Sequence, residues 1–388
     1  MTRMDFEFAT AGRILFGDGV VRQAAALAAG HGRQVLLVTG GGQERAAVIL
    51  DGLQQAGVST STFAVRGEPT LETARQAAQA ARESGCQVVV GFGGGSPLDT
   101  AKMVAVLLTN GGDPLDYAEI IGRGQTFTRP SAPMLAIPTT AGTGTEATRN
   151  AVLSSPEHRV KVSLRSPYLL PSVALVDPEL THTLPPAPTA HTGMDALTQL
   201  IEPYVSARAN PMTDGICVEG MRRVARSLRR AWERGRDAEA RRDMAMASLF
   251  GGIALANAGL GAVHGFAGPF GGMFPEAPHG AVCACLLAPV TETNIRAAAQ
   301  RDPKGRPLSR YRDVARLLTG QAQAEPEDAV AWLRDLCRDL EIPPLRAYGL
   351  TESDLPGLLE RAAAANSMRS NPISLTAEEM RRVVDLAA

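Results

Sequence analysis

Several features are scarce or missing in this chain of 388 residues, and each absence excludes a class of protein. No apolar run approaches the roughly 18 residues that a membrane-spanning helix needs. The first residues, "MTRMDFEFAT", lack the apolar core of a secretion signal. A net charge of -1 gives no electrostatic reason to bind nucleic acid or an anionic membrane. We therefore expect a cytoplasmic protein that acts on small molecules, with neither nucleic acid nor membrane as a partner.

The cysteines lack the spacing of the familiar sulfur motifs. There are five, and no two of them form a Cys-x-x-Cys pair. An odd and scattered set is typical of a reducing compartment such as the cytoplasm. Cys283 and Cys285 lie in the apolar stretch "GAVCACLLAPV". We interpret both as core residues rather than as metal ligands or a redox pair.

The first half of the chain alternates strand patterns with helical ones. Short apolar or β-branched runs bounded by Gly, Pro, Ser or charged residues predict buried parallel strands. These runs are 34–39, 61–65, 87–93, 134–139 and 173–177. Helical stretches separate the early ones, at 44–57 and 70–85. Strand and helix in alternation predict an α/β doubly wound sheet.

The second half shows helical periodicity and almost no strand pattern. Examples are 212–235, 329–340 and 377–387. The length of the chain favours two domains, and a cluster of prolines at 185, 186 and 188 is interpreted as the linker. We predict an α/β domain over residues 1–184 and an all-helical domain over residues 185–388. The basic stretch 221–243 carries acidic neighbours at helical spacing, so we interpret it as a solvated helix face.

Three loops rich in small residues follow predicted strands, where open α/β sheets bind ligands. They read "VTGGGQER", "GFGGGSPLDTAK" and "PTTAGTGTE". Glycines let backbone N–H groups approach a phosphate, and a helix N-terminus favours its charge. Pro97 fits the first position of such a helix. Neither GxGxxG nor a GK[ST] loop is present, yet the three loops together predict a bound nucleotide.

Six motifs occur in order along the chain: "ILFGDG" (14–19), "GFGGGSPLDTAK" (91–102), "IPTTAGTGTE" (137–146), "TGMDALTQLIEPYVS" (192–206), "AVHG" (262–265) and "APHGAVCA" (277–284). Taken together, these motifs resemble the iron-containing alcohol dehydrogenase family, whose fold is related to that of glycerol dehydrogenase and dehydroquinate synthase. The resemblance implies an N-terminal α/β dinucleotide-binding domain, an all-α C-terminal domain and an active site in the cleft between them. It implies NAD(P)-dependent hydride transfer between nicotinamide and a small alcohol, aldehyde or ketone, by a homodimer or higher homo-oligomer.

The resemblance also assigns the cofactor-binding residues. Gly94, Gly95 and Ser96 would hold the pyrophosphate, with Asp99 and Lys102 in the helix that follows. The nicotinamide and ribose would be lined by Thr139, Thr140, Thr143 and Thr145. Lys161 stands where the family often has a lysine that reaches the cofactor; the alternative is a solvated surface lysine.

The loop of Gly40, Gly41 and Gly42 bears on the choice of cofactor. NAD-preferring members of the family tend to have an acidic residue where this chain has Gly40. A carboxylate there would repel the 2′-phosphate of NADP, whereas Arg45 would neutralise it. We therefore favour NADP over NAD.

The resemblance further implies a site for Fe²⁺ or Zn²⁺. The family binds the ion with an Asp, a His four residues later and two downstream His. Asp195, His264 and His279 match the first, third and fourth ligands and are the catalytic residues that the resemblance implies. Gln199 stands in the second position, four residues after Asp195 and on the same helix face. An amide oxygen is a weaker donor than imidazole, so we expect Gln199 to weaken metal binding without abolishing it.

Two further departures from the family concern the substrate pocket. Gly268 stands where many members have another His, and the spacing from His264 to His279 is one residue longer than usual. His191, which we expect in the linker before the helix, is the nearest alternative imidazole. Three functions remain open: a metal-assisted dehydrogenase, a metal-independent reductase similar to maleylacetate reductases with His264 or His279 as proton donor, and a non-catalytic nucleotide-binding protein.

Overall fold

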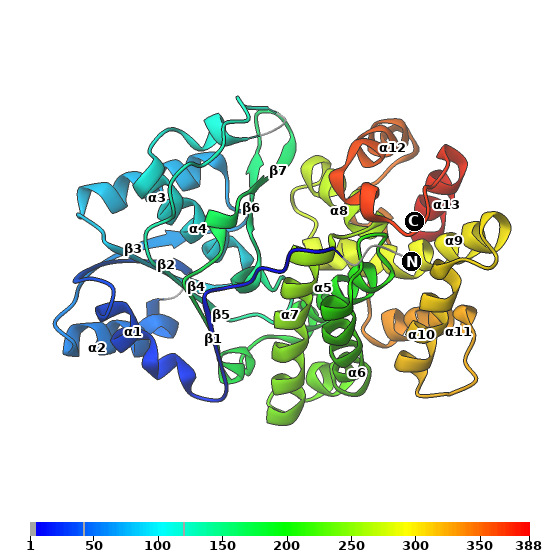
Figure 1. The fold of residues 1–388 in the computed structure, drawn as a ribbon, viewed down its shortest axis with the longest axis horizontal. Coiled ribbons are helices and arrows are strands. Elements are labelled where there is room, and N and C mark those ends of the chain that lie inside the picture. Colours follow the sequence, from blue (N-terminus) through cyan, green and yellow to red (C-terminus); the bar gives the residue numbers. More distant parts are fainter. Residues whose placement is uncertain (1–4, 42, 119–120) are drawn as a thin grey trace. The chain divides into compact units, whose positions relative to one another are not determined.

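The computed structural model describes residues 5–41, 43–118 and 121–388 (Figure 1). Contacts within the chain divide it into two compact units. The first, an α/β unit, comprises Ala9–Thr140 and Gly144–His182. The second, a helical unit, comprises Thr183–Ala388 together with Ala141–Thr143 and the N-terminal residues up to Phe8.

The α/β unit is built on a parallel six-stranded sheet, in agreement with the predicted fold class. All five predicted strands form. A sixth was not predicted, because its four residues, "RILF", are only partly buried and give a weak pattern. In sheet order the strands are β1 (Arg13–Phe16), β8 (Val173–Val176), β5 (Met134–Pro138), β4 (Val88–Gly93), β2 (Gln34–Gly40) and β3 (Ser59–Val65).

Helices cover both faces of this sheet (Figure 1). Successive residues of a strand point to opposite faces, and β2 shows it clearly. Leu36 and Val38 pack with one set of helices, while Val35 and Leu37 pack with the other. The first set is α3 (Leu71–Glu83) and α4 (Gly95–Asn110); the second is α1 (Ala24–Ala29) and α2 (Ala47–Gln55).

A two-stranded antiparallel hairpin, β6 (Asn150–Ser155) and β7 (Val160–Arg165), completes the α/β unit and was not predicted. Along both strands buried residues alternate with less buried ones, as expected for a hairpin with one covered face. Its turn contains Arg159, which has a positive φ of 50°. A non-glycine residue in that conformation gives no turn signal in the sequence, so the hairpin escaped notice.

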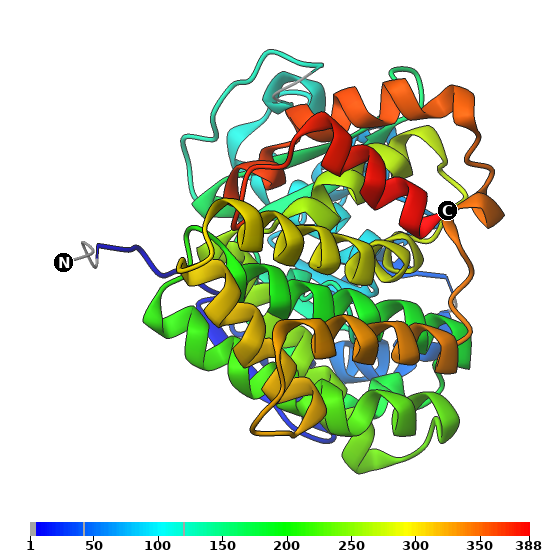
Figure 2. The ribbon, with the colours of Figure 1, turned by 90° about the vertical axis from the view of Figure 1, so that its right-hand side faces the viewer.

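The second unit is helical, as the sequence predicted (Figure 2). Among the residues that the structure describes, no single helix is long and apolar enough to cross a membrane. The helix pair Ala238–Ala258 and Ala262–Met273, bent by 100°, passes that test by length and composition only. The helices of this unit are α5 (Pro186–Val205), α6 (Pro211–Glu233), α7 (Ala238–Ala258), α8 (Ala262–Met273), α9 (His279–Arg301), α10 (Arg306–Thr319), α11 (Pro326–Asp339), α12 (Leu355–Ala364) and α13 (Ala377–Ala387).

The proline cluster is not a linker, which corrects the interpretation of the sequence. Pro185 is the N-cap of α5, and Pro186 and Pro188 lie in its first turn. The first N–H groups of a helix have no intrahelical acceptor, so proline costs nothing there. His191 therefore lies within α5, one turn before Asp195, and not ahead of the helix.

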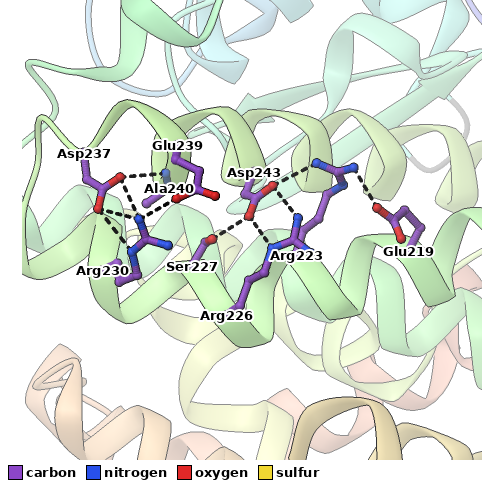
Figure 3. A network of polar contacts seen from close by, with 9 residues as sticks. All are labelled: Glu219, Arg223, Arg226, Ser227, Arg230, Asp237, Glu239, Ala240 and Asp243. Atoms are coloured by element: carbon purple, nitrogen blue, oxygen red, sulfur yellow. Dashed lines mark hydrogen bonds and ion pairs between the residues drawn. The ribbon is translucent and has the colours of Figure 1, made fainter. Parts of the chain in front are cut away.

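The basic stretch 221–243 joins two helices instead of forming a wholly solvated face (Figure 3). Asp243 of α7 accepts hydrogen bonds from Arg223 (2.8 Å), Arg226 (2.6 Å) and Ser227 (2.6 Å) of α6. Arg230 pairs with Asp237, and also with Glu239. Carboxylates therefore compensate three of these arginines locally.

Candidate metal and nucleotide sites

Three helices bring the predicted metal ligands together. Asp195 and Gln199 lie one turn apart on α5, His264 lies in the first turn of α8, and His279 is the first residue of α9. Asp195 Oδ1 is 3.4 Å from His264 Nε2 and 4.0 Å from His279 Nε2. The centroids of the two imidazole rings are 5.5 Å apart. Side chains separated by more than 80 positions in the sequence thus converge on one point.

Two oxygen atoms on α5 indicate that this site suits a cation. Asp195 Oδ1 and Gln199 Oε1 are both buried without a hydrogen-bond partner. Each unsatisfied acceptor costs about 1–3 kcal/mol, and a bound cation removes that cost. Carboxylate and amide oxygens beside two imidazole nitrogens form a donor set suited to Fe²⁺ or Zn²⁺. The residues therefore fit a divalent metal ion.

Cys283 joins this cluster, which corrects its interpretation as a residue of the core alone. Its Sγ lies 3.6 Å from His279 Nε2 and 3.9 Å from His264 Nε2. The potential ligand atoms of Asp195, His264, His279 and Cys283 all lie within 4.8 Å of one another. Because α9 begins at His279, Cys283 is one turn further along the same helix face. Its apolar neighbours in the sequence concealed this spacing.

Cys285, by contrast, makes the kind of contact that we predicted for both residues. Its Sγ donates to the carbonyl oxygen of Pro343 at 2.8 Å, and its side chain packs against the core of the helical unit. Two residues along a helix is a rotation of about 200°. The two cysteines of "CAC" therefore face different surroundings.

Glu202 is a residue of the site that the sequence analysis missed. Its Oε2 lies 2.6 Å from His264 Nδ1, and its Oε1 accepts a hydrogen bond from the backbone N–H of Val263 at 2.7 Å. Carboxylates that hold a metal-binding histidine in this way fix its tautomer and orientation. A signal exists in the sequence: Glu202 follows Asp195 by seven residues, two helical turns along the same face.

Charged groups within the cluster shift one another's pKa values. Burial works to raise the pKa of Asp195, but nearby His264 and His279 bring it below its usual value. Burial likewise opposes ionisation of Cys283, yet the same two histidines lower the pKa of its thiol. Burial works to lower the pKa of His264, but the thiolate of Cys283 and the carboxylate of Glu202 bring it above its usual value. The thiolate of Cys283 also raises the pKa of His279. The anionic and imidazole groups of the site thus favour each other's charged forms.

His191 and Gly268 lie outside the cluster. Among the described residues, the only group of His, Cys, Asp and Glu side chains close enough to share an ion is the one above. His191 does not belong to it, although its backbone carbonyl packs against Gly280. A Cβ at Gly268 would have no atom within 4 Å, so this glycine faces open space.

The glycine loops of the α/β unit meet at one point of the sheet edge. The chain passes from β2 to β3 on one side and from β4 to β5 on the other, so the connections reverse between β2 and β4. Open α/β sheets bind ligands at such a switch point. Gly40 ends β2, Gly41 follows it, and Gly94 follows β4 and lies beside Thr140. Gly42 lies outside the described residues.

The second loop leads directly into α4. Gly94 is the N-cap and the helix begins at Gly95, so Pro97 is its third residue and not the first. Backbone N–H groups of Gly95 and Ser96 therefore lie in the first turn, where an anion can accept from them. Gly93 has φ +150°, and a Cβ there would lie 2.4 Å from Pro97 Cγ. Only glycine fits this close approach of strand and helix.

The other predicted cofactor residues are tied into the α/β unit. Asp99 accepts from Thr145 Oγ1 at 2.5 Å and from the N–H of Val152 at 3.0 Å. Lys102 Nζ donates to Thr148 Oγ1 at 2.7 Å and is fully enclosed. These contacts join α4 to the β6 hairpin. The roles of Asp99 and Thr145 toward a cofactor remain predictions.

Lys161 and the threonines of the third loop differ in placement. The side chain of Lys161 is only 7% exposed, and its Nζ lies 3.1 Å from Glu68 Oε2. The alternative of a solvated surface lysine is therefore wrong. Thr139 and Thr140 follow β5 within the α/β unit, whereas Thr143 belongs to the helical unit.

A parallel sheet with glycine loops at its switch point and a helical unit with a cluster of potential metal ligands are the features expected of one class of protein, the nicotinamide-dependent metal dehydrogenases. Residues 11–178 match the family model described as iron-containing alcohol dehydrogenase. Residues 189–387 match the model of the C-terminal part of the Fe-containing alcohol dehydrogenase family. The chain belongs to this family, as its motifs indicated, and it is an NAD(P)-dependent alcohol dehydrogenase.

Known relatives resemble the chain over nearly its whole length. The 1,3-propanediol dehydrogenase of Klebsiella pneumoniae is 38% identical over 356 residues, which cover 88% of each chain. A crystal structure of a 1,3-propanediol oxidoreductase has a TM-score of 0.91 with 34% identity and covers 99% of this chain and all of the other. The sulfoacetaldehyde reductase of Bifidobacterium kashiwanohense, solved with NAD+, has a TM-score of 0.85 with 26% identity and covers 99% of each chain.

Proposed function

We propose that catalysis is metal-assisted and that Asp195, Gln199, His264 and His279 bind the divalent ion. The observation that carries the proposal is the pair of buried, unpartnered oxygens on Asp195 and Gln199 beside two imidazole nitrogens. A divalent ion held there supplies Lewis-acid polarisation of an alcohol or carbonyl oxygen. The substrates are small alcohols and the corresponding aldehydes or ketones; the similarity to a 1,3-propanediol dehydrogenase and a 1,3-propanediol oxidoreductase supports this part of the proposal.

The metal proposal is tested by metal analysis of protein purified without oxygen, paired with NADPH oxidation by a panel of short aldehydes. A stoichiometric ion, with turnover lost on chelation, supports the proposal. Turnover without any ion overturns it in favour of a metal-independent reductase, with His264 or His279 as proton donor. NADPH binding without an ion or turnover overturns it in favour of the non-catalytic alternative. Asp195→Ala is the matched control, because it removes the anionic oxygen of α5.

We also propose that NADP is preferred over NAD. Gly40 offers no carboxylate to repel a 2′-phosphate, and Arg45 lies exposed a few residues further on, where its Nη2 donates to the carbonyl of Leu180 at 3.0 Å. Arg45→Ala should lower the affinity for NADPH and leave that for NADH unchanged, both measured by nucleotide fluorescence. Arg33→Ala is the control. Tighter binding of NADH by the unaltered protein would contradict the proposal.

We also propose that the protein forms a homodimer or larger homo-oligomer and that it lies in the cytoplasm. All five cysteines are free thiols, as is usual in a reducing compartment. Light scattering coupled to size exclusion tests the assembly, and a monomer at micromolar concentration would contradict it.

A further inference from the structure

We propose that the thiolate of Cys283 is a metal ligand and compensates for the imidazole that Gln199 does not supply. This inference rests on the proposed metal-assisted function and deepens it, because it adds Cys283 to the proposed ligands. It also narrows the ion to a thiophilic one. Thiolate ligands favour Zn²⁺ over hard cations such as Mg²⁺ or Mn²⁺.

The separations between ligand atoms support a shared ion. Tetrahedral Zn²⁺, with bonds of about 2.0–2.1 Å to N or O and about 2.3 Å to S, places its ligand atoms roughly 3.3–3.6 Å apart. Cys283 Sγ lies 3.6 Å from His279 Nε2 and 3.9 Å from His264 Nε2. Asp195 Oδ1 lies 3.4 Å and 4.0 Å from the same two nitrogens. These four separations are at or slightly above the range that a shared ion requires.

Three of the other four cysteines show how thiols in this protein behave when they only pack. Cys285, Cys337 and Cys86 each direct Sγ to a backbone carbonyl, at 2.8 Å, 3.4 Å and 3.2 Å. Cys283 Sγ instead contacts ring nitrogens of two histidines. Those nitrogens are the atoms that point toward Asp195. The thiol of Cys283 therefore occupies a position that a core cysteine has no need to adopt.

Helix geometry explains how the chain builds this donor set. His279 and Cys283 are one turn apart on α9, and Asp195 and Gln199 are one turn apart on α5, which packs against α9. Gln199 is a neutral and weak donor. A thiolate at Cys283 adds a second negative charge beside Asp195. Two anionic donors balance the charge of a divalent ion in a site where burial makes an uncompensated charge costly.

The test is Co²⁺ substitution of the full-length protein, followed by absorption spectroscopy. A bound Co²⁺ gives visible ligand-field bands with any donor set, whereas a near-ultraviolet charge-transfer band requires thiolate. We expect both in the unaltered protein. Cys283→Ser should retain the visible bands and lose the charge-transfer band. Cys285→Ser, two residues away and directed to a carbonyl, should retain both.

A second variant and a second ion keep the inference falsifiable. Cys283→Ala, checked for its helical circular dichroism, should lose affinity for Cd²⁺ while its affinity for Mn²⁺ changes little. Adding Gln199→His to Cys283→Ser should restore Zn²⁺ affinity without restoring the charge-transfer band.

The outcomes separate this inference from the proposed function. Visible bands without charge transfer in the unaltered protein overturn the role of Cys283 and leave the metal proposal standing. A charge-transfer band that persists in Cys283→Ser assigns the thiolate to another cysteine and likewise overturns the inference. Failure to bind Co²⁺, Zn²⁺ or Cd²⁺ stoichiometrically overturns both.

Discussion

His264 and Glu202 form a hydrogen bond of 2.6 Å between Nδ1 and Oε2. A carboxylate only accepts, so Nδ1 carries a proton, and the ring is held with Nε2 on the side of Asp195, 3.4 Å from its Oδ1. The carboxylate is buried and is itself fixed by the backbone N–H of Val263. Glu202 is thus a positioning residue: it acts on the proposed ion only through the ring of His264.

Removing the charge of Glu202 should weaken metal binding without unfolding the chain. Loss of such a partner typically lowers metal affinity about 10–100-fold, and we expect Glu202→Gln to fall in that range. Competition with a chromogenic chelator measures the effect. Glu276→Gln removes an exposed charge from the loop before α9 and is the control. Equal losses in the two variants would show that Glu202 acts through general electrostatics and not through His264.

One substitution at position 199 should increase the affinity for metal. Gln199→His should tighten Zn²⁺ binding, because imidazole is a better donor than an amide oxygen. Gln199→Leu keeps a similar volume but removes the donor, so it should bind less tightly than the unaltered protein. Chelator competition ranks the three proteins, and thermal unfolding of the metal-free forms verifies that each is folded. If all three bind alike, Gln199 is not a ligand.

The sequence was informative wherever a pattern is local. Apolar runs such as "QVVVGFG" identified the central strands, because a strand covered on both faces is apolar throughout. The β6–β7 hairpin escaped because its turn at Arg159 uses a conformation that most residues avoid. The prolines before His191 were read as a linker, although the first turn of a helix tolerates proline well.

The site was only partly readable for a different reason. Asp195, His264 and His279 were found through motifs, but each contact among them joins separate helices. Cys283 was assigned to the core because burial and ligation look alike in an apolar stretch. It is in fact both buried and adjacent to two imidazoles. Only the packing of α5, α8 and α9 distinguishes the two roles.

A buried carboxyl group in the α/β unit predicts a pH dependence of stability. Burial raises the pKa of Glu146 to about 7, against 4.5 for an ordinary glutamate, and its Oε2 has no hydrogen-bond partner. Between these values the folded chain binds more protons than the unfolded one, so this group makes stability fall as pH rises. Glu146→Gln should remove roughly 2.5 kcal/mol of that loss between pH 5 and pH 8.

Denaturant unfolding at the two pH values measures this dependence. Glu157→Gln neutralises an exposed glutamate in the turn of the β6 hairpin and is the control. We expect Glu157→Gln to retain the pH dependence of the unaltered protein. If the free energy of unfolding of Glu146→Gln falls with pH as steeply as that of the unaltered protein, Glu146 is ionised throughout the range, with its charge stabilised by Lys102.

Gly280 links the backbone of α5 to the histidine at the start of α9. A Cβ at this position would lie 2.3 Å from the carbonyl oxygen of His191, a backbone atom that has no rotamer by which to move away. Gly280→Ala must therefore push apart the first turn of α9 and α5. Because His279 precedes Gly280 and Asp195 lies one turn beyond His191, the variant should separate ligands on the two helices. We expect it to lose roughly 1–3 kcal/mol of stability together with metal affinity.

Gly268→Ala is the matched control for this change. It adds the same methyl group to a helical glycine near the site, but a Cβ there meets no atom within 4 Å. Alanine in place of a helical glycine stabilises by about 0.5–1 kcal/mol, so Gly268→Ala should raise the midpoint of thermal unfolding and bind metal normally. Gly280→Ala should therefore lose both stability and metal affinity, whereas Gly268→Ala should gain stability and keep its metal affinity. Normal metal binding by Gly280→Ala would show that α5 and α9 separate without moving His279 from Asp195, so that the packing at Gly280 does not set the geometry of the ligands.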